Sequence, residues 1–456
     1  MKHIGRYIIR GLLGRGGMGK VFKVELPAIG KTAALKLLDP DPLLAKLLGM
    51  QKLRDLFVAE AKTMARLNHP HIVDLHDFDE DQGKPFYVMA FYANNIGALI
   101  GESYQADRPS RIIRADKALY YVRQTLDGLA CLHDAGIVHR DVKPFNLLVT
   151  ERDTIKICDF GLSKLRGEAF AGPSHLNVGS PFYAAPEQEK APDAAAPNAD
   201  LYPLGVMLYR MLTGRLPEHP PRHAMYRAPS RLNTELDGEW DRFIAQAMAV
   251  APQERFASAG EMLRALDNLD LYWQRLKEKA CALRATAVVN RPEAQLSSEL
   301  RTAPVKLTPR AAAHQFGLDL LWRPRVFTAN RYEALSAEIV ADPATRRVWQ
   351  RTGSSFPCTW QQAHTYIQSL NAEQFAGRGR WRLPTIEELI TLLRPTPQLQ
   401  ELCIAPLFGP TQRWLWSSDR RSFTAAYYVD VQLGFVGWQD FSAPYYVRAV
   451  CTMDHD

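Results

Sequence analysis

The sequence has no uninterrupted apolar run of the length that crosses a membrane. Its first residues, MKHIGRYIIRGLLGRGG, also lack an apolar core followed by a small-residue cleavage site. A transmembrane helix needs about 20 mostly apolar residues, and a secretion signal needs such a core and site. We therefore expect a soluble chain that stays in the cytoplasm and has no membrane span.

Cysteine is scarce, and charge of one sign is not concentrated in any long run. Six cysteines are scattered among 456 residues without a CxxC pair, which excludes the usual sequence pattern of a zinc ribbon or a disulfide scaffold. The net charge is +7, but basic and acidic residues are mixed through most of the chain. This mixture favours solubility over a dedicated nucleic-acid surface, so we do not expect nucleic acid as a partner.

The chain does have enough length and apolar content for more than one core. A length of 456 residues is typical of two or three domains, and 46% of the residues are hydrophobic. Lysine nearly disappears after residue 280, where eighteen of the nineteen basic residues are Arg. The stretch 276–330 contains several prolines and no sustained apolar period. We predict a domain over 1–275, a linker over 276–330 and a second domain over 331–456.

The apolar pattern changes part-way through the first domain. Over the first ninety residues, short β-branched runs alternate with one helical stretch, LRDLFVAEAKTMARL. From about 116 to 275, apolar residues recur at helical spacing, with Gly136 and Gly214 as helix ends. These periods predict a β-rich lobe with a single helix, followed by a helical lobe.

A glycine-rich run, GRGGMGKV at 14–21, lies between two predicted strands. Because glycine lacks a Cβ atom, backbone N–H groups in such a run can approach phosphate oxygens closely. By itself, the GxGxxG spacing also fits a dinucleotide-binding turn or a plain hairpin. A strand rather than a helix follows it, which argues against the dinucleotide fingerprint.

Further blocks follow the glycine-rich run in a fixed order: AALK at 33–36, Glu60, HRDVKPFN at 139–146, DFG at 159–161 and APE at 185–187. Together these blocks resemble a eukaryotic-like bacterial Ser/Thr protein kinase over about residues 7–270. The resemblance implies a bilobal α+β protein kinase fold. It also implies ATP with Mg²⁺ or Mn²⁺ as cofactors, and proteins with Ser or Thr hydroxyls as substrates.

The resemblance assigns residues to the nucleotide side of phosphoryl transfer, which needs a cation for the phosphates and carboxylates for the metal. Lys36 would bind the phosphates, and Glu60 would hold Lys36 in place. Asp159 and Asn146 would bind the metal ion, which keeps much of its water. The other nucleotide-binding positions implied by the resemblance are Gly14, Gly16, Gly19, Val21, Ala34, Met89, Ala90 and Tyr92.

On the substrate side, Asp141 would accept or orient the proton of the attacking hydroxyl, and Lys143 would neutralise the transferring phosphate. Arg140 suggests a basic pocket that a phosphate on the activation segment stabilises. Ser174 is the candidate for that autophosphorylation. Among these residues, Asp141, Lys143, Lys36 and Glu60 form the predicted catalytic set.

Two downstream features resemble structural positions of the same family. Asp200 is expected to cap the backbone of the catalytic loop, residues 139–146, and Arg255 is expected to pair with Glu187. Neither feature would touch a substrate. They would hold the loops that carry the predicted catalytic set.

The C-terminal part combines helix signals with short aromatic strands. TWQQAHTYIQSL at 359–370 predicts a helix, and Thr385 followed by Glu388 predicts a capping box at the start of another. Short apolar strands are expected at 414–416, 426–431, 434–437 and 445–450. These elements predict a compact α+β module.

Four blocks of this part, DPATRRVW, GRWRLPT, WSS and YVRAV, resemble the bacterial DUF1566 type of domain. Its fold is related to C-type lectins and formylglycine-generating enzymes, so the resemblance implies a smaller α+β C-type-lectin-like domain. The aromatic residues and arginines fit either of two roles. They fill a loop-rich core, or exposed Trp438, Tyr428 and Tyr445 form a ligand-binding surface.

We therefore expect an ATP-dependent Ser/Thr protein kinase whose C-terminal module senses or recruits an unknown ligand or protein. The alternative is a ligand- or partner-binding protein, such as a diversified C-type-lectin-fold variable protein, in which the kinase fold is a scaffold. The presence of Lys36, Asp141, Asn146 and Asp159 favours the kinase. A third reading, nucleic-acid binding through the Arg-rich linker, predicts an affinity that falls steeply with salt.

Overall fold

The computed structural model describes residues 2–105, 107–159, 182–190, 196–217, 226–283, 293–294, 300–395 and 402–453. The chain divides into two compact units, an N-terminal unit of Met1–Ala285 and a C-terminal unit of Thr286–Asp456. Across these described ranges, none of the helices is both long and apolar enough to span a lipid bilayer.

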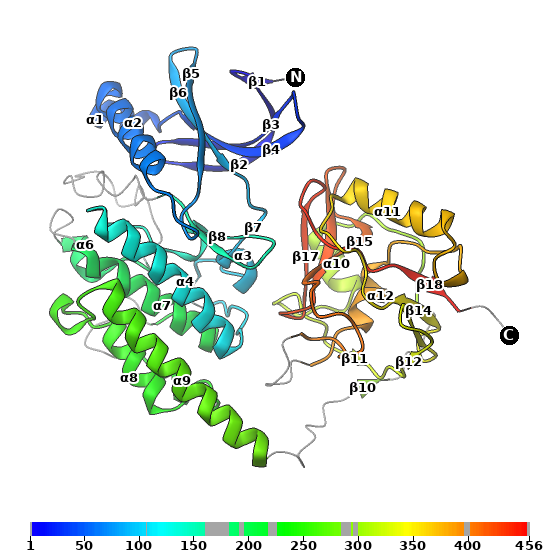
Figure 1. Ribbon diagram of the computed structural model, residues 1–456. Coiled ribbons are helices and arrows are strands. Elements are labelled where there is room, and N and C mark those ends of the chain that lie inside the picture. Colours follow the sequence, from blue (N-terminus) through cyan, green and yellow to red (C-terminus); the bar gives the residue numbers. More distant parts are fainter. Residues whose placement is uncertain are drawn as a thin grey trace. The chain divides into compact units, whose positions relative to one another are not determined.

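The N-terminal unit begins with an antiparallel sheet in the strand order β1-β2-β3-β4-β6-β5 (Figure 1). Its strands are β1 (His3–Ile4), β2 (Tyr7–Gly16), β3 (Gly19–Leu26), β4 (Lys31–Leu38), β5 (Leu75–Asp81) and β6 (Lys84–Ala90). Helix α2 (Met50–Arg66) contacts β5 and β6 and buries Leu53, Phe57 and Met64 at helical spacing. A short helix, α1 (Pro42–Leu48), precedes α2 and was not predicted; it buries none of its residues, although four of them are Leu.

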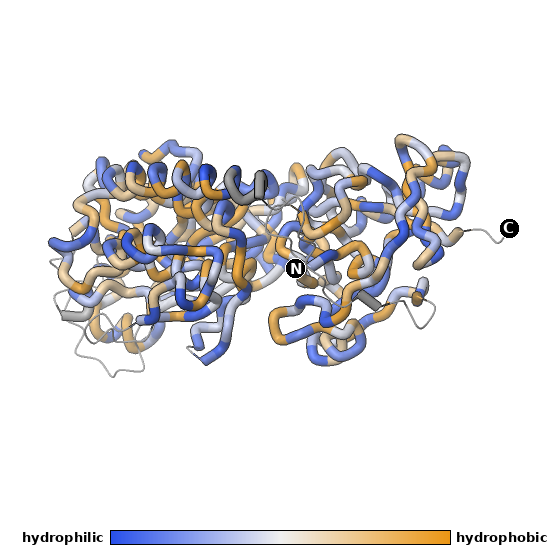
Figure 2. The backbone as a smooth tube through the Cα atoms, turned by 90° about the horizontal axis from the view of Figure 1, so that it is seen from below, coloured by the Kyte–Doolittle hydropathy of each residue, from blue (hydrophilic) through white to orange (hydrophobic). Residues whose placement is uncertain are grey.

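The rest of this unit is mainly helical, as the sequence predicts. Its helices are α3 (Ile96–Ile100), α4 (Ala115–Asp134), α6 (Pro186–Lys190), α7 (Leu201–Thr213), α8 (Gly238–Ala247) and α9 (Ala259–Leu283). Every residue of α7 is buried, so this helix forms the centre of the lobe. Along the helices of this lobe, hydrophobic and hydrophilic segments alternate (Figure 2), as expected of helices that bury one face. A small sheet of β7 (Asn94–Asn95), β8 (Leu147–Val149) and β9 (Ile155–Ile157) flanks the catalytic loop.

The C-terminal unit is an α+β module. One sheet contains β12 (Glu333–Ala334), β13 (Ile339–Asp342), β14 (Arg347–Gln350) and β18 (Val450–Thr452), and another contains β15 (Trp414–Arg420), β16 (Ala425–Asp430) and β17 (Phe435–Asp440). Strands β10 (Glu293–Ala294) and β11 (Phe327–Thr328) pair in parallel. The helices are α10 (Pro309–Gln315), α11 (Trp360–Ala372) and α12 (Ile386–Thr391), and the last two begin with capping boxes at Thr359 and Thr385. Both predicted helices are thus confirmed.

The structure corrects the predicted linker over 276–330. Helix α9 continues to Leu283, and the later part of the stretch packs into the core of the C-terminal unit. The buried residues are Ala312, Phe316 and Leu318. They lie on a short helix and in turns, so no apolar period marked them. A fragment starting near Gln315 would lose α10 and part of this core.

One predicted strand of the C-terminal unit is also corrected. At 445–450, Tyr445 and Tyr446 form isolated bridges, and the regular strand β18 begins only at Val450. The apolar run predicts burial there correctly, because Tyr445 and Val447 are buried. Burial alone does not fix strand pairing, which depends on a neighbouring edge with matching register.

Glu388, at the start of α12, joins several donors inside the C-terminal unit. Its carboxylate accepts from Arg382 at 2.6 Å, from Arg347 at 2.5 Å and from the Thr385 N–H at 3.0 Å. Burial raises the pKa of Glu388, but Arg382, the Thr385 N–H and Arg347 lower it by more, so it lies below its ordinary value of 4.5. Its contribution to stability is therefore complete above about pH 4.5 and is lost as the pH falls through the lowered pKa.

We predict that Glu388→Gln makes the stability of the C-terminal unit less dependent on pH between 7 and 3. Urea unfolding followed by tryptophan fluorescence measures this, because seven of the nine tryptophans lie in that unit. Glu387→Gln is the control, since Glu387 is a partly exposed neighbour whose partners among the described residues are Arg301 and Gln315. Equal pH profiles for Glu388→Gln and the natural sequence would contradict the prediction.

Candidate active site

The glycine-rich run forms the end of the β2–β3 hairpin, where Gly16 pairs with Gly19. A Cβ atom on Gly14 or Gly16 would meet no atom within 4 Å, so both positions border open space. A Cβ atom on Gly19 would lie 2.0 Å from the Leu37 carbonyl oxygen. Gly19 is therefore required for the close approach of β3 to β4, whereas Gly14 and Gly16 leave room above the hairpin.

Lys36 on β4 lies between two carboxylates. Its Nζ is 2.8 Å from Glu60 Oε1 on α2 and 3.1 Å from Asp159 Oδ1. Burial lowers the pKa of Lys36, but the charges of Glu60 and Asp159 raise it by more, so the pKa is well above its ordinary value. Burial raises the pKa of Asp159, and Lys36 lowers it by more. Lys36 is thus a fixed cation and Asp159 a fixed anion.

Three residues of the catalytic loop also contact one another. Lys143 Nζ donates to Asp141 Oδ2 at 2.7 Å. Asn146 Nδ2 donates to the Asp141 carbonyl oxygen at 2.9 Å and to its Oδ2 at 3.2 Å. A 3-10 turn over Pro144–Asn146 brings Asn146 back toward Asp141. The loop therefore holds a carboxylate, an ammonium group and an amide in one cluster.

Asp200 caps the backbone of this loop, as predicted. Its carboxylate is fully buried and accepts from the N–H groups of His139 at 2.8 Å and Arg140 at 2.6 Å. His133 Nε2 lies 2.9 Å from the same carboxylate. Arg140 has a φ of 61°, a conformation that costs energy for a residue with a side chain. The two bonds to Asp200 stabilise that conformation.

The predicted pair of Glu187 and Arg255 is also present, at 2.6 and 2.7 Å. The neighbouring Gln188 donates to the Arg140 carbonyl oxygen at 3.0 Å, which ties α6 to the catalytic loop. Ser174, the predicted autophosphorylation site, lies outside the described residues.

The strand register places the remaining predicted nucleotide positions near one another. Val21 is opposite both Gly14 and Lys36, and Ala34 is opposite Met89. Met89 and Ala34 are buried, whereas the side chains of Ala90, the last residue of β6, and Tyr92, which follows it, are half-buried. All these positions except the loop glycines therefore lie on β3, β4, β6 or the segment that follows β6.

Sequence reasoning missed a buried ion pair beside the catalytic loop. Arg210, in the last turn of α7, donates to Glu102 at 3.1 Å, and both side chains are fully buried. Glu102 also accepts from the Tyr183 hydroxyl at 2.6 Å and from the N–H groups of Ser103 and Tyr104. A signal existed: an arginine inside the apolar run LYPLGVMLYRML needs a buried partner.

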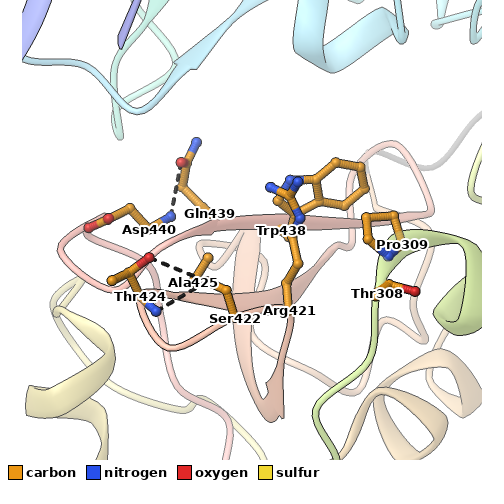
Figure 3. Close-up of a pocket in the computed structure, with 9 residues that line it drawn as sticks. All are labelled: Thr308, Pro309, Arg421, Ser422, Thr424, Ala425, Trp438, Gln439 and Asp440. Carbon is orange, nitrogen blue, oxygen red and sulfur yellow. Dashed lines mark hydrogen bonds between the residues drawn. The ribbon is translucent and has the colours of Figure 1, made fainter. Parts of the chain in front are cut away.

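The C-terminal unit has an open pocket of about 690 Å³, whose lining residues are Thr308, Pro309, Arg421, Ser422, Thr424, Ala425, Trp438, Gln439 and Asp440 (Figure 3). The Arg421 guanidinium lies against the Trp438 ring at 4.8 Å. The structure corrects the predicted surface, because Tyr428 and Tyr445 are only 4% and 0% exposed and belong to the core. Of the three predicted aromatic residues, Trp438 alone borders the pocket.

Residues 7–265, more than half of the chain, match the protein kinase domain family. This chain belongs to the protein kinase family. The kinase domain is 34% identical over 275 residues to the serine/threonine-protein kinase PksC of Streptomyces coelicolor, a match that covers 57% of this chain and 48% of PksC. It is 30% identical over 290 residues to the serine/threonine-protein kinase pkn3 of Myxococcus xanthus, covering 58% of this chain and 50% of that protein.

The chain thus spans half or less of the length of these curated relatives. Among solved structures, it is similar to the PknI kinase domain of Mycobacterium tuberculosis, with 26% identity, a TM-score of 0.44, and coverage of 59% of this chain and 97% of that chain. Residues 338–451 match the Lcl C-terminal domain.

Proposed function

We propose that the chain is an ATP-dependent Ser/Thr protein kinase. One observation carries the proposal: Lys36 lies in hydrogen-bond contact with both Glu60 and Asp159. A fixed cation beside a fixed carboxylate suits the binding of a metal–phosphate group, since the two residues neutralise opposite charges on it. The named relatives are Ser/Thr protein kinases, which supports the choice of a protein hydroxyl as acceptor.

The residues present fit ATP with Mg²⁺ or Mn²⁺. Asp159 offers a carboxylate, and Asn146 offers Oδ1 because its Nδ2 donates to Asp141. Oxygen ligands of this kind are those that Mg²⁺ prefers. The metal, when bound, would neutralise charge on the phosphates. Gly14 and Gly16 leave space for those phosphates, and the segment after Met89 would bind the adenine.

Asp141 would accept the proton of the substrate Ser or Thr as that oxygen attacks the terminal phosphorus of ATP, whose bond to the β–γ bridging oxygen breaks so that ADP leaves. Lys143, 2.7 Å from Asp141, would stabilise negative charge on the transferring group. Asn146 fixes the orientation of the Asp141 carboxylate through its bond to Oδ2. The chain therefore supplies positioning and charge, the two contributions that phosphoryl transfer chiefly needs.

The test is transfer of label from γ-³²P-ATP to a generic basic protein by the full chain, with Mg²⁺ and then with Mn²⁺. Labelled phosphoserine or phosphothreonine in an acid hydrolysate of the basic protein supports the proposal. No transfer with either metal, by protein whose far-UV circular dichroism shows it folded, would favour the alternative in which the kinase fold is a scaffold for a binding module.

We further propose that the C-terminal unit is a DUF1566-type module with a C-type-lectin-like fold that senses or recruits a ligand. The pocket beside Trp438 and Arg421 supports this role, because an aromatic face next to a guanidinium supplies both contact area and donors. A thermal-shift screen of small molecules on the full chain would test it. Phe356→Ala is the control, because Phe356 is an exposed aromatic residue that does not line the pocket. Stabilisation that Trp438→Ala loses and Phe356→Ala keeps supports the pocket, and equal shifts in both variants count against it.

A further inference from the structure

Tyr87 lies on β6 directly opposite Lys36 on β4, and neither the kinase motifs nor the family match assigns it a role. Its side chain is buried, with 1% of the residue exposed. The hydroxyl donates to Glu60 Oε1 at 2.9 Å, and Lys36 Nζ donates to the same oxygen at 2.8 Å. Two neighbouring strands therefore hold one carboxylate oxygen of α2.

Both of these donors bind the same oxygen of the Glu60 carboxylate, Oε1. Its other oxygen, Oε2, is buried and has no hydrogen-bond partner among the described residues. A buried carboxylate that loses a donor pays the desolvation cost of the unmade bond. Burial raises the pKa of Tyr87 well above its ordinary value, so the hydroxyl keeps its proton. If Glu60 moved away, this buried donor would lose its acceptor and incur the same desolvation cost. Each group thus stabilises the other in the observed place.

The ring of Tyr87 makes contacts that do not need the hydroxyl. It packs against Phe57 of α2 with ring centroids 5.1 Å apart, and it lies 5.5 Å from Lys36 Nζ. A phenylalanine at this position would keep both contacts. The hydroxyl alone therefore connects β6 to Glu60, and its effect can be measured without disturbing the packing.

We propose that Tyr87 is a positioning residue for the nucleotide phosphates: its hydroxyl fixes Glu60, and Glu60 fixes Lys36 at the place where the phosphates bind. This inference rests on the proposed kinase function and adds a further residue to it. It implies that the position of α2 is set by two donors from the sheet rather than by Lys36 alone. A change at Tyr87 should affect the use of ATP but not the affinity for the protein substrate.

The experiment compares Tyr87→Phe with the natural sequence in the full chain. We expect kcat/KM for ATP to fall about tenfold or more, the size of one lost hydrogen bond to a charged group, with KM for the protein substrate unchanged. Tyr121→Phe is the matched control. Tyr121 is equally buried and donates to Asp153 at 2.7 Å, but it lies on α4, away from Lys36. It should retain full activity.

A double-mutant cycle with Glu60→Gln separates positioning from general loss of stability. If Tyr87 acts through Glu60, adding Tyr87→Phe to Glu60→Gln should lower kcat/KM for ATP by less than twofold. Additive losses, or a Tyr87→Phe variant with unchanged kcat/KM for ATP, would overturn the inference while the natural sequence still transfers phosphate. A natural sequence that transfers none would instead refute the kinase function and the inference with it.

Discussion

Asp159→Asn is expected to lower phosphoryl transfer by at least about 10²–10³-fold, the range seen when one preorganised electrostatic contact is removed from an active site. A neutral amide cannot replace the carboxylate that would hold the metal against the phosphates. It also loses the ion pair with Lys36, whose Nζ lies 3.1 Å from Asp159 Oδ1. Lys36 keeps its bond to Glu60, so the fold should survive.

Initial rates of label transfer at saturating ATP and Mg²⁺ measure this effect. Asp55→Asn is a matched control, because Asp55 is an exposed carboxylate on α2 whose side chain accepts a hydrogen bond from Gln51 and from no other residue in the described part of the chain. That variant should retain the full rate. An Asp159→Asn protein with near-normal activity would show that Asp159 does not hold the metal.

Glu102→Gln is expected to destabilise the N-terminal unit by about 3–5 kcal/mol, the usual cost of removing one partner from a buried ion pair. The Glu102 and Arg210 side chains are both fully buried, so the guanidinium would stay in the core without its counter-charge. The Tyr183 hydroxyl, 2.6 Å from Glu102, would lose its charged acceptor as well. Tyr183, which precedes α6, should then be held less firmly.

Urea-dependent hydrogen exchange of the α7 amides measures the global stability of this unit. Asp267→Asn provides the comparison, because Asp267 pairs with Arg123 on the surface, where side chains are 49% and 37% exposed. An exposed pair of this kind contributes at most about 1 kcal/mol. Similar decreases in the free energy of unfolding in the two variants would mean that the Glu102–Arg210 pair stabilises the unit no more than an exposed pair does.

Much of the kinase domain could be predicted from the sequence because its function requires particular residue types in a particular order. The contact of Lys36 with Glu60, and the cap that Asp200 places on the catalytic loop, match what the motifs predict. The roles of these residues in ATP binding and catalysis stay predictions. Helix signals were also local: the capping box at Thr385 was predicted from Glu388, three residues later, and is confirmed.

The failures share one cause, which is that burial depends on segments far apart in the chain. Tyr428 and Tyr445 were candidates for a binding surface, but their rings pack against each other with centroids 4.6 Å apart. The stretch around α10 was predicted to be a linker, but Phe316 packs on Tyr427, more than a hundred residues later. Aromatic content alone does not show which face a strand turns inward.

The sequence by itself determined the order of the lobes, the identity of the family and the set of charged groups that phosphoryl transfer would need, because each of these depends on residue type and local spacing. Only the tertiary structure decided which polar groups outside the kinase motifs meet. Glu102 and Arg210 are 108 positions apart in the sequence. The Tyr87 hydroxyl, on strand β6, donates to Glu60 on helix α2. Such pairs leave no local period, since a buried charge or hydroxyl is satisfied by whichever distant segment the packing brings within hydrogen-bond reach.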